Sequence, residues 1–207
     1  MDFFIVCLAT MVASALTLFS GFGLGTLLMP VIALFFPLET AIAMTAMVHL
    51  ANNFFKTGLL GKHADRQVLL RFGLPAIIAA FAGATLMTWL SDIRPIYEYQ
   101  AFGNALQVSP LKLVIGLLII FFVTIELSPR FSKIVLDRKY LSVGGMISGF
   151  FGGLSGHQGA FRSMFLLKAG LSKETFIATG IAIAVMVDLS RMVIYGLDIS
   201  IQQKQLE

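Results

Sequence analysis

The sequence predicts an all-α polytopic membrane protein, and three observations point to this fold class. The 207 residues are 57% hydrophobic and only 13% charged, whereas an ordinary soluble domain carries about 25% charged residues. The mean hydropathy of the chain is +0.89. Two stretches, residues 3–38 and 72–91, contain no Asp, Glu, Lys or Arg. Because a helix needs about 20 residues to cross the bilayer core, each stretch is long enough to lie in a membrane.

Charged and polar residues divide the chain into its expected elements. We expect a glycine-broken hairpin, three helical spans, a second glycine-broken hairpin and a last helix. Their ranges are 3–37, 40–56, 69–91, 111–126, 140–170 and 175–197. A polar stretch at 92–110 and a loop at 128–139 separate the later elements.

Length and glycine content predict the two hairpins. Two complete crossings need about 40 residues, and residues 140–170 are too few for them. Glycines gather near the middle of this segment, at Gly149, Gly152, Gly153, Gly156 and Gly159. The first hairpin has the same design, with Gly21, Gly23 and Gly25 followed by Pro30. We therefore expect two pairs of half-helices whose tips end near the middle of the membrane.

A second interpretation exists for some of these glycines. Gly145, Gly149 and Gly153 are spaced four residues apart, and this spacing is also typical of close helix packing in membranes. The sequence leaves both interpretations open.

The order of the elements repeats along the chain. An offset of 134 residues places Gly25 on Gly159 and Thr45 on Thr179. Three spans separate the two hairpins, so the first repeat begins outside and the second begins inside. This is an inverted-topology repeat, a layout in which substrate sites form near the midplane. Residues 1–139 are the first repeat and residues 140–207 the second. By symmetry we would expect two more spans in the second repeat, roughly 60 further residues with their loops, so we expect the chain to be either a short form or a fragment.

The basic residues predict the orientation. Lys and Arg concentrate around 56–71 and 130–139, and short cytoplasmic loops are enriched in these residues. We expect these two loops inside, and the N-terminus, the stretch 92–110 and the C-terminal tail outside. The net charge of +4 shows no basic face with interleaved aromatic residues, so we expect no nucleic-acid partner. Cys7 is the single cysteine, which excludes an intramolecular disulfide and a thiolate metal cage.

Candidate binding residues gather at the second glycine break. His157 and Gln158 lie in it, Gly159 starts the returning half-helix, and Arg162 follows. Glycine lets the backbone leave helical geometry, and the start of a helix attracts anions through its free N–H groups and its dipole. Arg162 is the only fixed positive charge close to a predicted break. An ionisable group at membrane depth normally faces a partner or a cavity, so we expect Arg162 to bind an anion. Gly25 is the counterpart of Gly159 in the first repeat.

Two other helices contribute polar residues at membrane depth. His49, Asn52 and Asn53 belong to a polar stripe on helix 40–56, and we add the two asparagines to the predicted anion site. In the last helix Asp188 lies near the middle and Arg191 shares its face. We expect Asp188, His49 and Arg191 to act as coupling or counter-ion groups. The alternative is structural: Asp188 neutralises Arg191 or Arg162 and holds helices together, and His49 is a hydrogen-bonded packing residue.

With these residues in view, the chain resembles the sulfite exporter TauE/SafE family of membrane permeases. The matching pieces are residues 20–26 (SGFGLGT) with Pro30, and residues 149–156 (GFFGGLSG) with Gly159. The resemblance covers nearly the whole chain. It implies secondary transport of small sulfur-containing or carboxylate anions. We expect a multi-pass protein of the cell membrane with no cofactor and no metal.

The predicted function is a secondary permease for sulfite, an organosulfonate or a related sulfur oxyanion. Its partners are the small anion and the lipid bilayer, and a homo-oligomer is left open. One alternative is a rhomboid-like intramembrane serine protease, because residues 153–156 match the GxSG pattern and Ser155 would be its nucleophile. Such an enzyme needs a His base within hydrogen-bond reach of Ser155, and no His follows His157. A non-transporting membrane protein is the other alternative.

Overall fold

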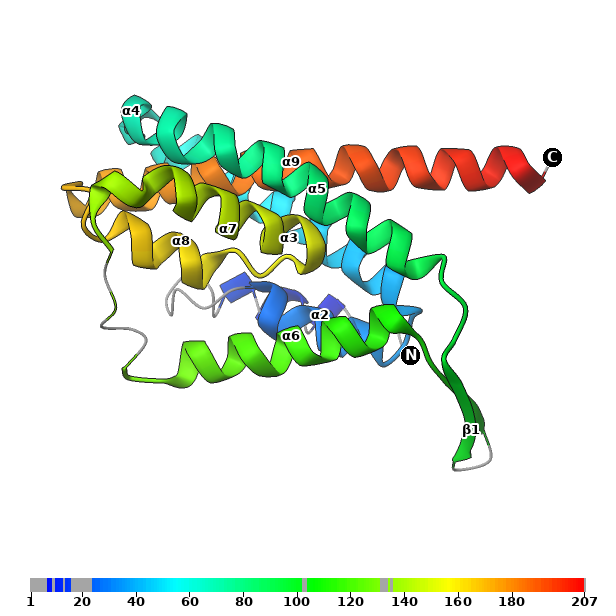
Figure 1. Ribbon diagram of the computed structural model, residues 1–207. Helices are drawn as coiled ribbons and strands as arrows, with labels where there is room; N and C mark the ends of the chain where they lie inside the picture. The colour runs from blue at the N-terminus through cyan, green and yellow to red at the C-terminus, as the bar shows by residue number, and fades with distance from the viewer. Residues whose placement is uncertain are drawn as a thin grey trace.

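The computed structural model describes residues 24–101, 104–130, 134 and 136–206, together with residues 7–8, 10–12 and 14–15. This part of the chain is mostly helical (Figure 1). Its labelled helices are α2 (Leu24–Ala33), α3 (Leu38–Leu60), α4 (Arg66–Val68), α5 (Leu74–Ser91), α6 (Pro110–Leu127), α7 (Leu141–Ser155), α8 (Gly159–Leu166) and α9 (Lys173–Leu206). A π-helical turn at Leu69–Gly73 joins α4 to α5, and 3₁₀ turns occupy Gly61–His63 and Arg138–Tyr140.

Three segments are long and apolar enough to cross a membrane, namely Arg66–Ser91, Pro110–Leu127 and Lys173–Asp198. They contain three of the four helices expected to cross, at 69–91, 111–126 and 175–197, so these three predictions are confirmed in length and composition. The first span starts earlier than expected because the Asp65 side chain accepts a hydrogen bond from the backbone N–H of Val68 (2.8 Å) and caps the helix. Helix α3, which contains the span expected at 40–56, is longer than expected, but its polar residues keep it out of this set of three apolar helices.

The polar stretch between α5 and α6 corrects the all-α expectation. Strands β1 (Tyr97–Ala101) and β2 (Asn104–Val108) form an antiparallel pair in which Tyr97 faces Val108. The rings of Tyr97 and Tyr99 stack with centroids 6.2 Å apart. Alternate residues of a strand lie on one face, and aromatic residues favour this geometry. The hairpin extends away from the helices (Figure 1).

The segment predicted as the second hairpin is broken in the middle, as expected. Helix α7 ends at Ser155, Gly156 has a φ of +80°, and α8 returns from Gly159. Only glycine adopts this backbone conformation without strain. The last turn of α7 lies beside Gly83, because a Cβ there would collide with the backbone of Phe150 and Leu154. Helix α5 continues eight residues past Gly83, about 12 Å at 1.5 Å per residue. The hairpin therefore turns back within the length of a span.

A stripe of glycines fixes α7 against the span that begins at Arg66. A Cβ added at Gly145, Gly149 or Gly153 would collide with the backbone of Phe72, Ala76 or Ala80, respectively. The two backbones therefore touch at three successive turns, as small residues allow in membranes. The close-packing interpretation is confirmed for these three glycines, and the break itself lies just beyond them.

The first predicted hairpin can be followed only in part. Its glycines Gly21 and Gly23, and the half-helix before them, lie outside the described residues. Helix α2 is the returning half, with Pro30 inside it. Leu28 and Ile32 of α2 pack with Ala41 of α3 in a buried cluster.

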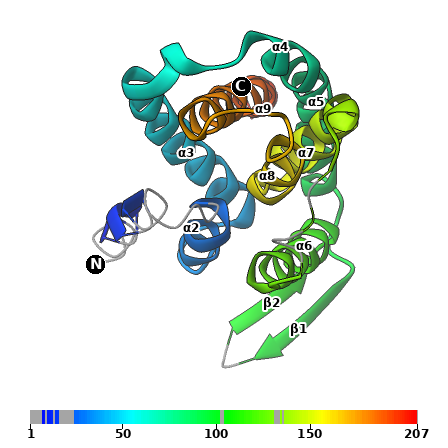
Figure 2. The same ribbon diagram turned by 90° about the vertical axis from the view of Figure 1, so that its left-hand side faces the viewer.

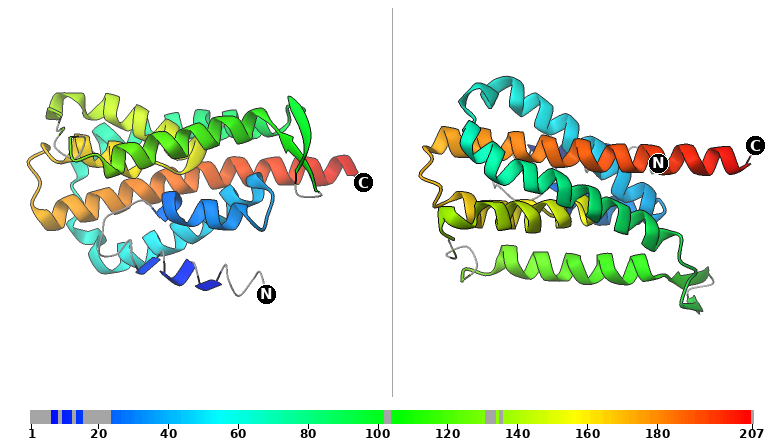
Figure 3. Two further views of the ribbon diagram at one scale, coloured as in Figure 1. Left: turned by 90° about the horizontal axis from the view of Figure 1, so that it is seen from below. Right: turned by 45° about the horizontal axis from the view of Figure 1, so that its top comes forward.

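Two helices of each half can be compared under the expected offset. Under the same offset of 134 residues, α2 falls on α8 and the start of α3 falls on the start of α9 to within one residue. Helices α3 and α9 pack together and run in opposite directions (Figure 3). Helix α9 lies centrally, with α3 on one side and α5, α7 and α8 on the other (Figure 2).

Candidate functional site

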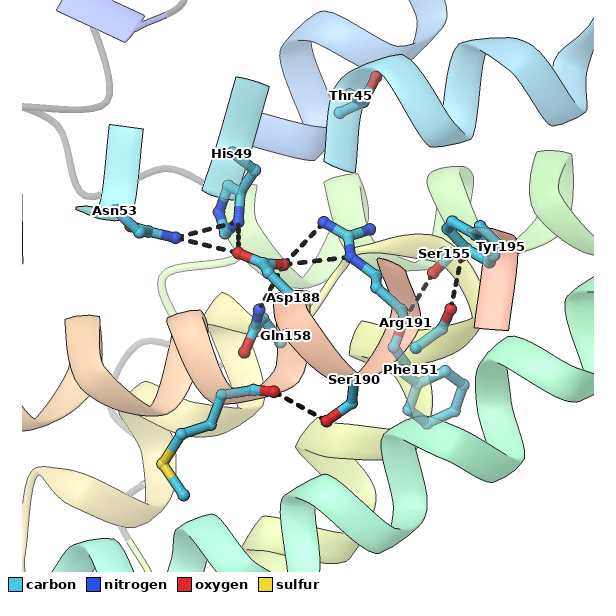
Figure 4. A network of polar contacts seen from close by, with 12 residues as sticks. Thr45, His49, Asn53, Phe151, Ser155, Gln158, Asp188, Ser190, Arg191 and Tyr195 are labelled. Carbon is cyan, nitrogen blue, oxygen red and sulfur yellow. Dashed lines mark hydrogen bonds and ion pairs between the residues drawn. The ribbon is translucent and has the colours of Figure 1, made fainter. Parts of the chain in front are cut away.

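The polar residues predicted at membrane depth meet where α9 packs against α3 and against the break between α7 and α8. Asp188 of α9 is completely buried and lies at the centre (Figure 4). His49 and Asn53 reach it from α3, and Gln158 reaches it from the break. The fold therefore brings together three segments that are far apart in sequence.

Each carboxylate oxygen of Asp188 has its own partners. Oδ2 accepts hydrogen bonds from His49 Nδ1 at 2.5 Å and from Asn53 Nδ2 at 3.2 Å. Oδ1 accepts hydrogen bonds from Arg191 Nη2 at 2.8 Å and Nε at 3.1 Å, and from Gln158 Nε2 at 3.4 Å. A buried carboxylate needs a compensating charge and hydrogen bonds to offset its desolvation. Arg191 supplies that charge, so the predicted structural pairing of Asp188 with Arg191 is present.

The guanidinium of Arg191 lies against the backbone of the glycine break. Its side chain is 1% exposed, and its Nη1 would be 2.7 Å from a Cβ added at Gly156. The expectation that Arg162 is the only positive charge near a break is therefore wrong. Sequence spacing could not reveal this, because the packing of α9 against the hairpin brings Arg191 to Gly156.

Arg162 differs from Arg191 in its partners. Its Nη1 donates to Gln158 Oε1 at 3.1 Å, and among the described residues no carboxylate lies within 4.0 Å of it. Gln158 accepts from Arg162 and donates to Asp188, so the amide bridges two groups that do not touch. The structure therefore contradicts the alternative in which Asp188 pairs directly with Arg162. Lys56 of α3 is close enough to Arg162 for their charges to repel, which leaves this side of the network positive.

The other predicted binding residues form no hydrogen bond with the described residues of this network. Asn52 is half-buried on α3 and makes no hydrogen bond to the described residues of the network. Gly159 begins α8, and a Cβ there would meet nothing within 4 Å. Gly25 lies near the start of α2. The network therefore brings together His49, Asn53, Gln158, Asp188, Arg162 and Arg191.

His157 lies at the same break, close enough to Arg191 and His49 to feel their charges, and its direct contacts are with Ser155 and Phe122. Its Nδ1 is 3.1 Å from Ser155 Oγ, and its ring stacks on Phe122 of α6 with centroids 4.9 Å apart. The contact that a serine protease requires is thus present. However, Ser155 donates its hydroxyl hydrogen to the carbonyl of Phe151 (3.1 Å), and both Ser155 and His157 are buried. Their geometry is that of a helix end, with the hydroxyl bonded back to the preceding turn.

Sequence reasoning missed three residues that shape the break. Ser148 donates to the carbonyl of Gln158 (3.0 Å), and Tyr195 donates to the carbonyl of Gly153 (2.8 Å). Phe122 is completely buried and supports His157. None of them is charged or belongs to a motif. In the sequence, only the polar groups of Ser148 and Tyr195 within apolar segments could have pointed to them. The part of the chain that the structure describes contains no cluster of three His, Cys, Asp or Glu that could hold a metal ion.

Comparison with known proteins gives one match. The sequence model of the family described as sulfite exporter TauE/SafE matches residues 6–206. No curated protein and no solved structure matches the chain significantly.

Proposed function

The chain belongs to the sulfite exporter TauE/SafE family, and from this premise we propose that it is a secondary permease for sulfite, an organosulfonate or a related small sulfur oxyanion. Membership makes the protein a multi-pass membrane transporter of sulfur anions and not an enzyme. The choice among these anions and the secondary mechanism are our proposal.

One observation carries the proposal. Arg162 lies four residues after Gln158 at a helix break within a span's length, and it has no carboxylate partner among the described residues. A cation in a membrane protein normally pairs with an anion or faces a cavity. Since Arg191 already neutralises Asp188, the nearest acidic group cannot neutralise Arg162 as well. The missing negative charge is the substrate.

The proposed anion site surrounds the guanidinium of Arg162. Arg162 and Gln158 are its main donors, with His157 beside them and the backbone at Gly159 at the start of α8. Asn53 and Asn52 close it from α3, and Gly25 is the equivalent backbone position of the first hairpin. Arg presents a planar fork of donors that fits a sulfite or sulfonate group at two oxygens.

Asp188, His49 and Arg191 form the counter-ion group of this site. Arg191 and His49 hold the two oxygens of Asp188, and Asp188 in turn fixes the amide of Gln158. The amide oxygen of Gln158 then faces Arg162 and holds the guanidinium in place. In this role Asp188 acts through Gln158 and does not touch the substrate.

We further propose that residues 1–139 and 140–207 belong to two inverted repeats. Support comes from the opposite directions of α3 and α9 and from the shared offset of α2–α3 and α8–α9. Labelling with an impermeant thiol reagent tests the orientation in a Cys7→Ser background. Tyr97→Cys should react from outside and Lys62→Cys should not. Reaction of Lys62→Cys from outside would reverse the scheme.

Transport itself is tested with the chain in proteoliposomes. Vesicles preloaded with unlabelled sulfite should accumulate radiolabelled sulfite by exchange, and sulfonates should compete with it. Vesicles that contain Arg162→Ala should lose this exchange, whereas those with Lys168→Ala, a change at an exposed residue beyond α8, should keep it. If vesicles with the wild-type chain accumulate no more labelled sulfite than vesicles without protein, the permease proposal is rejected.

A further inference from the structure

His157 has a buried nitrogen that no described residue satisfies. Its side chain is 4% exposed, and its Nε2 atom has no hydrogen-bond partner among the described residues. The ring cannot easily turn away, because it lies parallel to the ring of Phe122 with an interplanar angle of 13°. Leaving a buried polar atom unpaired is costly, so such an atom in a folded protein calls for a reason.

The contacts of Ser155 determine which nitrogen of His157 carries the hydrogen. A serine hydroxyl has one hydrogen, and Ser155 donates it to the carbonyl of Phe151. The 3.1 Å contact between Ser155 Oγ and His157 Nδ1 is then a hydrogen bond that Nδ1–H donates. In the neutral imidazole the unpartnered Nε2 is therefore a lone pair, which can only accept a hydrogen bond.

This tautomer has a consequence for an anion at the same break. Sulfite and sulfonate oxygens are acceptors, so they repel a bare Nε2 and bind it only when it carries a hydrogen. Because Nδ1 keeps its own hydrogen, the second one makes the ring an imidazolium. We propose that each anion bound at this site takes up one proton at His157 Nε2, so that anion and proton are bound together. This inference rests on the proposed function and names its coupling ion.

The charges around His157 favour joint binding. Arg191 from α9 and His49 from α3 act on it electrostatically, and Arg162 follows it on α8. Helix α6 carries Glu126, four residues after Phe122 and within reach of Thr26, and α5 and α7 have no titratable side chain. An imidazolium beside Arg191 is unfavourable alone and becomes favourable beside an anion. The proton therefore enters with the substrate.

Methanesulfonate is the appropriate probe, because it stays fully ionised at every working pH and any pH dependence then belongs to the protein. Calorimetric titration of the full chain in two buffers of different ionisation enthalpy measures the protons taken up. We expect about one proton per anion where His157 is neutral in the free protein. The apparent Kd should then rise about tenfold per pH unit, as linkage to one proton requires.

Two variants separate the proton from the hydrogen bond. His157→Gln supplies a permanent N–H donor at a position similar to Nε2, so it should bind methanesulfonate with no proton uptake and no pH dependence. His157→Phe keeps the stacking on Phe122 but removes both nitrogens, and it should bind at least tenfold more weakly. His63→Gln, at an exposed histidine outside the network, is the matched control and should behave as the wild type.

The possible outcomes are distinguishable. Wild-type binding without proton uptake overturns the inference and leaves the permease proposal intact. Uptake that persists in His157→Gln and disappears in His49→Gln also overturns it, and assigns the proton to the pair of His49 and Asp188. A wild-type chain that binds neither methanesulfonate nor sulfite would overturn the proposed function, and the inference with it.

Discussion

The pairs α2–α3 and α8–α9 share a backbone layout and differ in chemistry. In each pair a short returning helix leads through a corner into a long helix, and the starts of the elements agree under one offset. Thr45 and Thr179 are equivalent positions and both are buried. Yet Asp188 corresponds to Phe54, which is 50% exposed, and Arg162 corresponds to the completely buried Leu28.

This difference shows how two pairs of helices with one layout can contribute different groups to one polar network. The second pair supplies the break residue Gln158 and the ions Arg162, Asp188 and Arg191. The first pair contributes His49 and Asn53 from the side of α3 that packs on α9. Positions related by the offset of 134 residues are therefore not chemically equivalent, and the anion site that we propose lies on the second hairpin.

The largest effect is expected where the second hairpin touches its neighbour. Gly149→Leu places a side chain against the backbone of Ala76, which cannot move away without displacing α7. This overpacking should lower the free energy of unfolding by more than about 4 kcal/mol and prevent folding. Gly116→Leu in α6 is the matched control, because a Cβ there meets nothing within 4 Å. Size-exclusion profiles and thermal unfolding in detergent measure both, and a well-folded Gly149→Leu would contradict the close contact.

A smaller loss of stability is expected from the ion pair that Asp188 and Arg191 form within the second pair of helices. Asp188→Asn leaves the buried Arg191 without its counter-ion, which should reduce the free energy of unfolding by about 3–5 kcal/mol. Asp188→Asn combined with Arg191→Leu should recover most of this loss. Asp137→Asn changes an exposed carboxylate and should have little effect. Equilibrium unfolding in mixed micelles compares them, and a double variant no more stable than Asp188→Asn would show that the charge is not the cause.

The smallest effect compares the two equivalent threonines. Thr179 accepts a hydrogen bond from the backbone N–H of Asp65 (2.9 Å), so Thr179→Val removes the partner of a backbone donor. This should cost about 1 kcal/mol. Thr45 only donates to the carbonyl of Ala41 on its own helix (2.7 Å), and Thr45→Val should stay within about 0.5 kcal/mol. Equal losses in the same unfolding assay would mean that the two positions have the same role.

Much of the fold was predictable because the bilayer restricts what an apolar chain can form. Segment length predicted three of the four expected spans, and clustered glycines predicted the break between α7 and α8. The strands β1 and β2 were missed because the charges of the polar stretch hid the alternation around Tyr97 and Tyr99. The early start of the first span depends on the cap at Asp65, a local contact that hydropathy does not register.

The residue types of the site were predictable from the sequence, but the ion pairs among them were less so. Polar residues at membrane depth are few, so His49, Gln158, Asp188 and Arg162 stood out. Which cation neutralises Asp188 depends on how α9 rotates against the hairpin, and the sequence left Arg191 and Arg162 as alternatives. The structure pairs Arg191 with Asp188 and leaves Arg162 hydrogen-bonded to Gln158 alone among the described residues.

Anion binding by Arg162 is the central claim, and a binding titration tests it most directly. Sulfite and methanesulfonate are titrated into the purified wild type, Arg162→Ala, Arg162→Lys and the control Lys168→Ala, each first shown to be folded. Arg162→Ala should lose measurable binding, Arg162→Lys should keep part of it because the charge remains without the fork, and Lys168→Ala should match the wild type. Unchanged affinity in a folded Arg162→Ala would contradict the site.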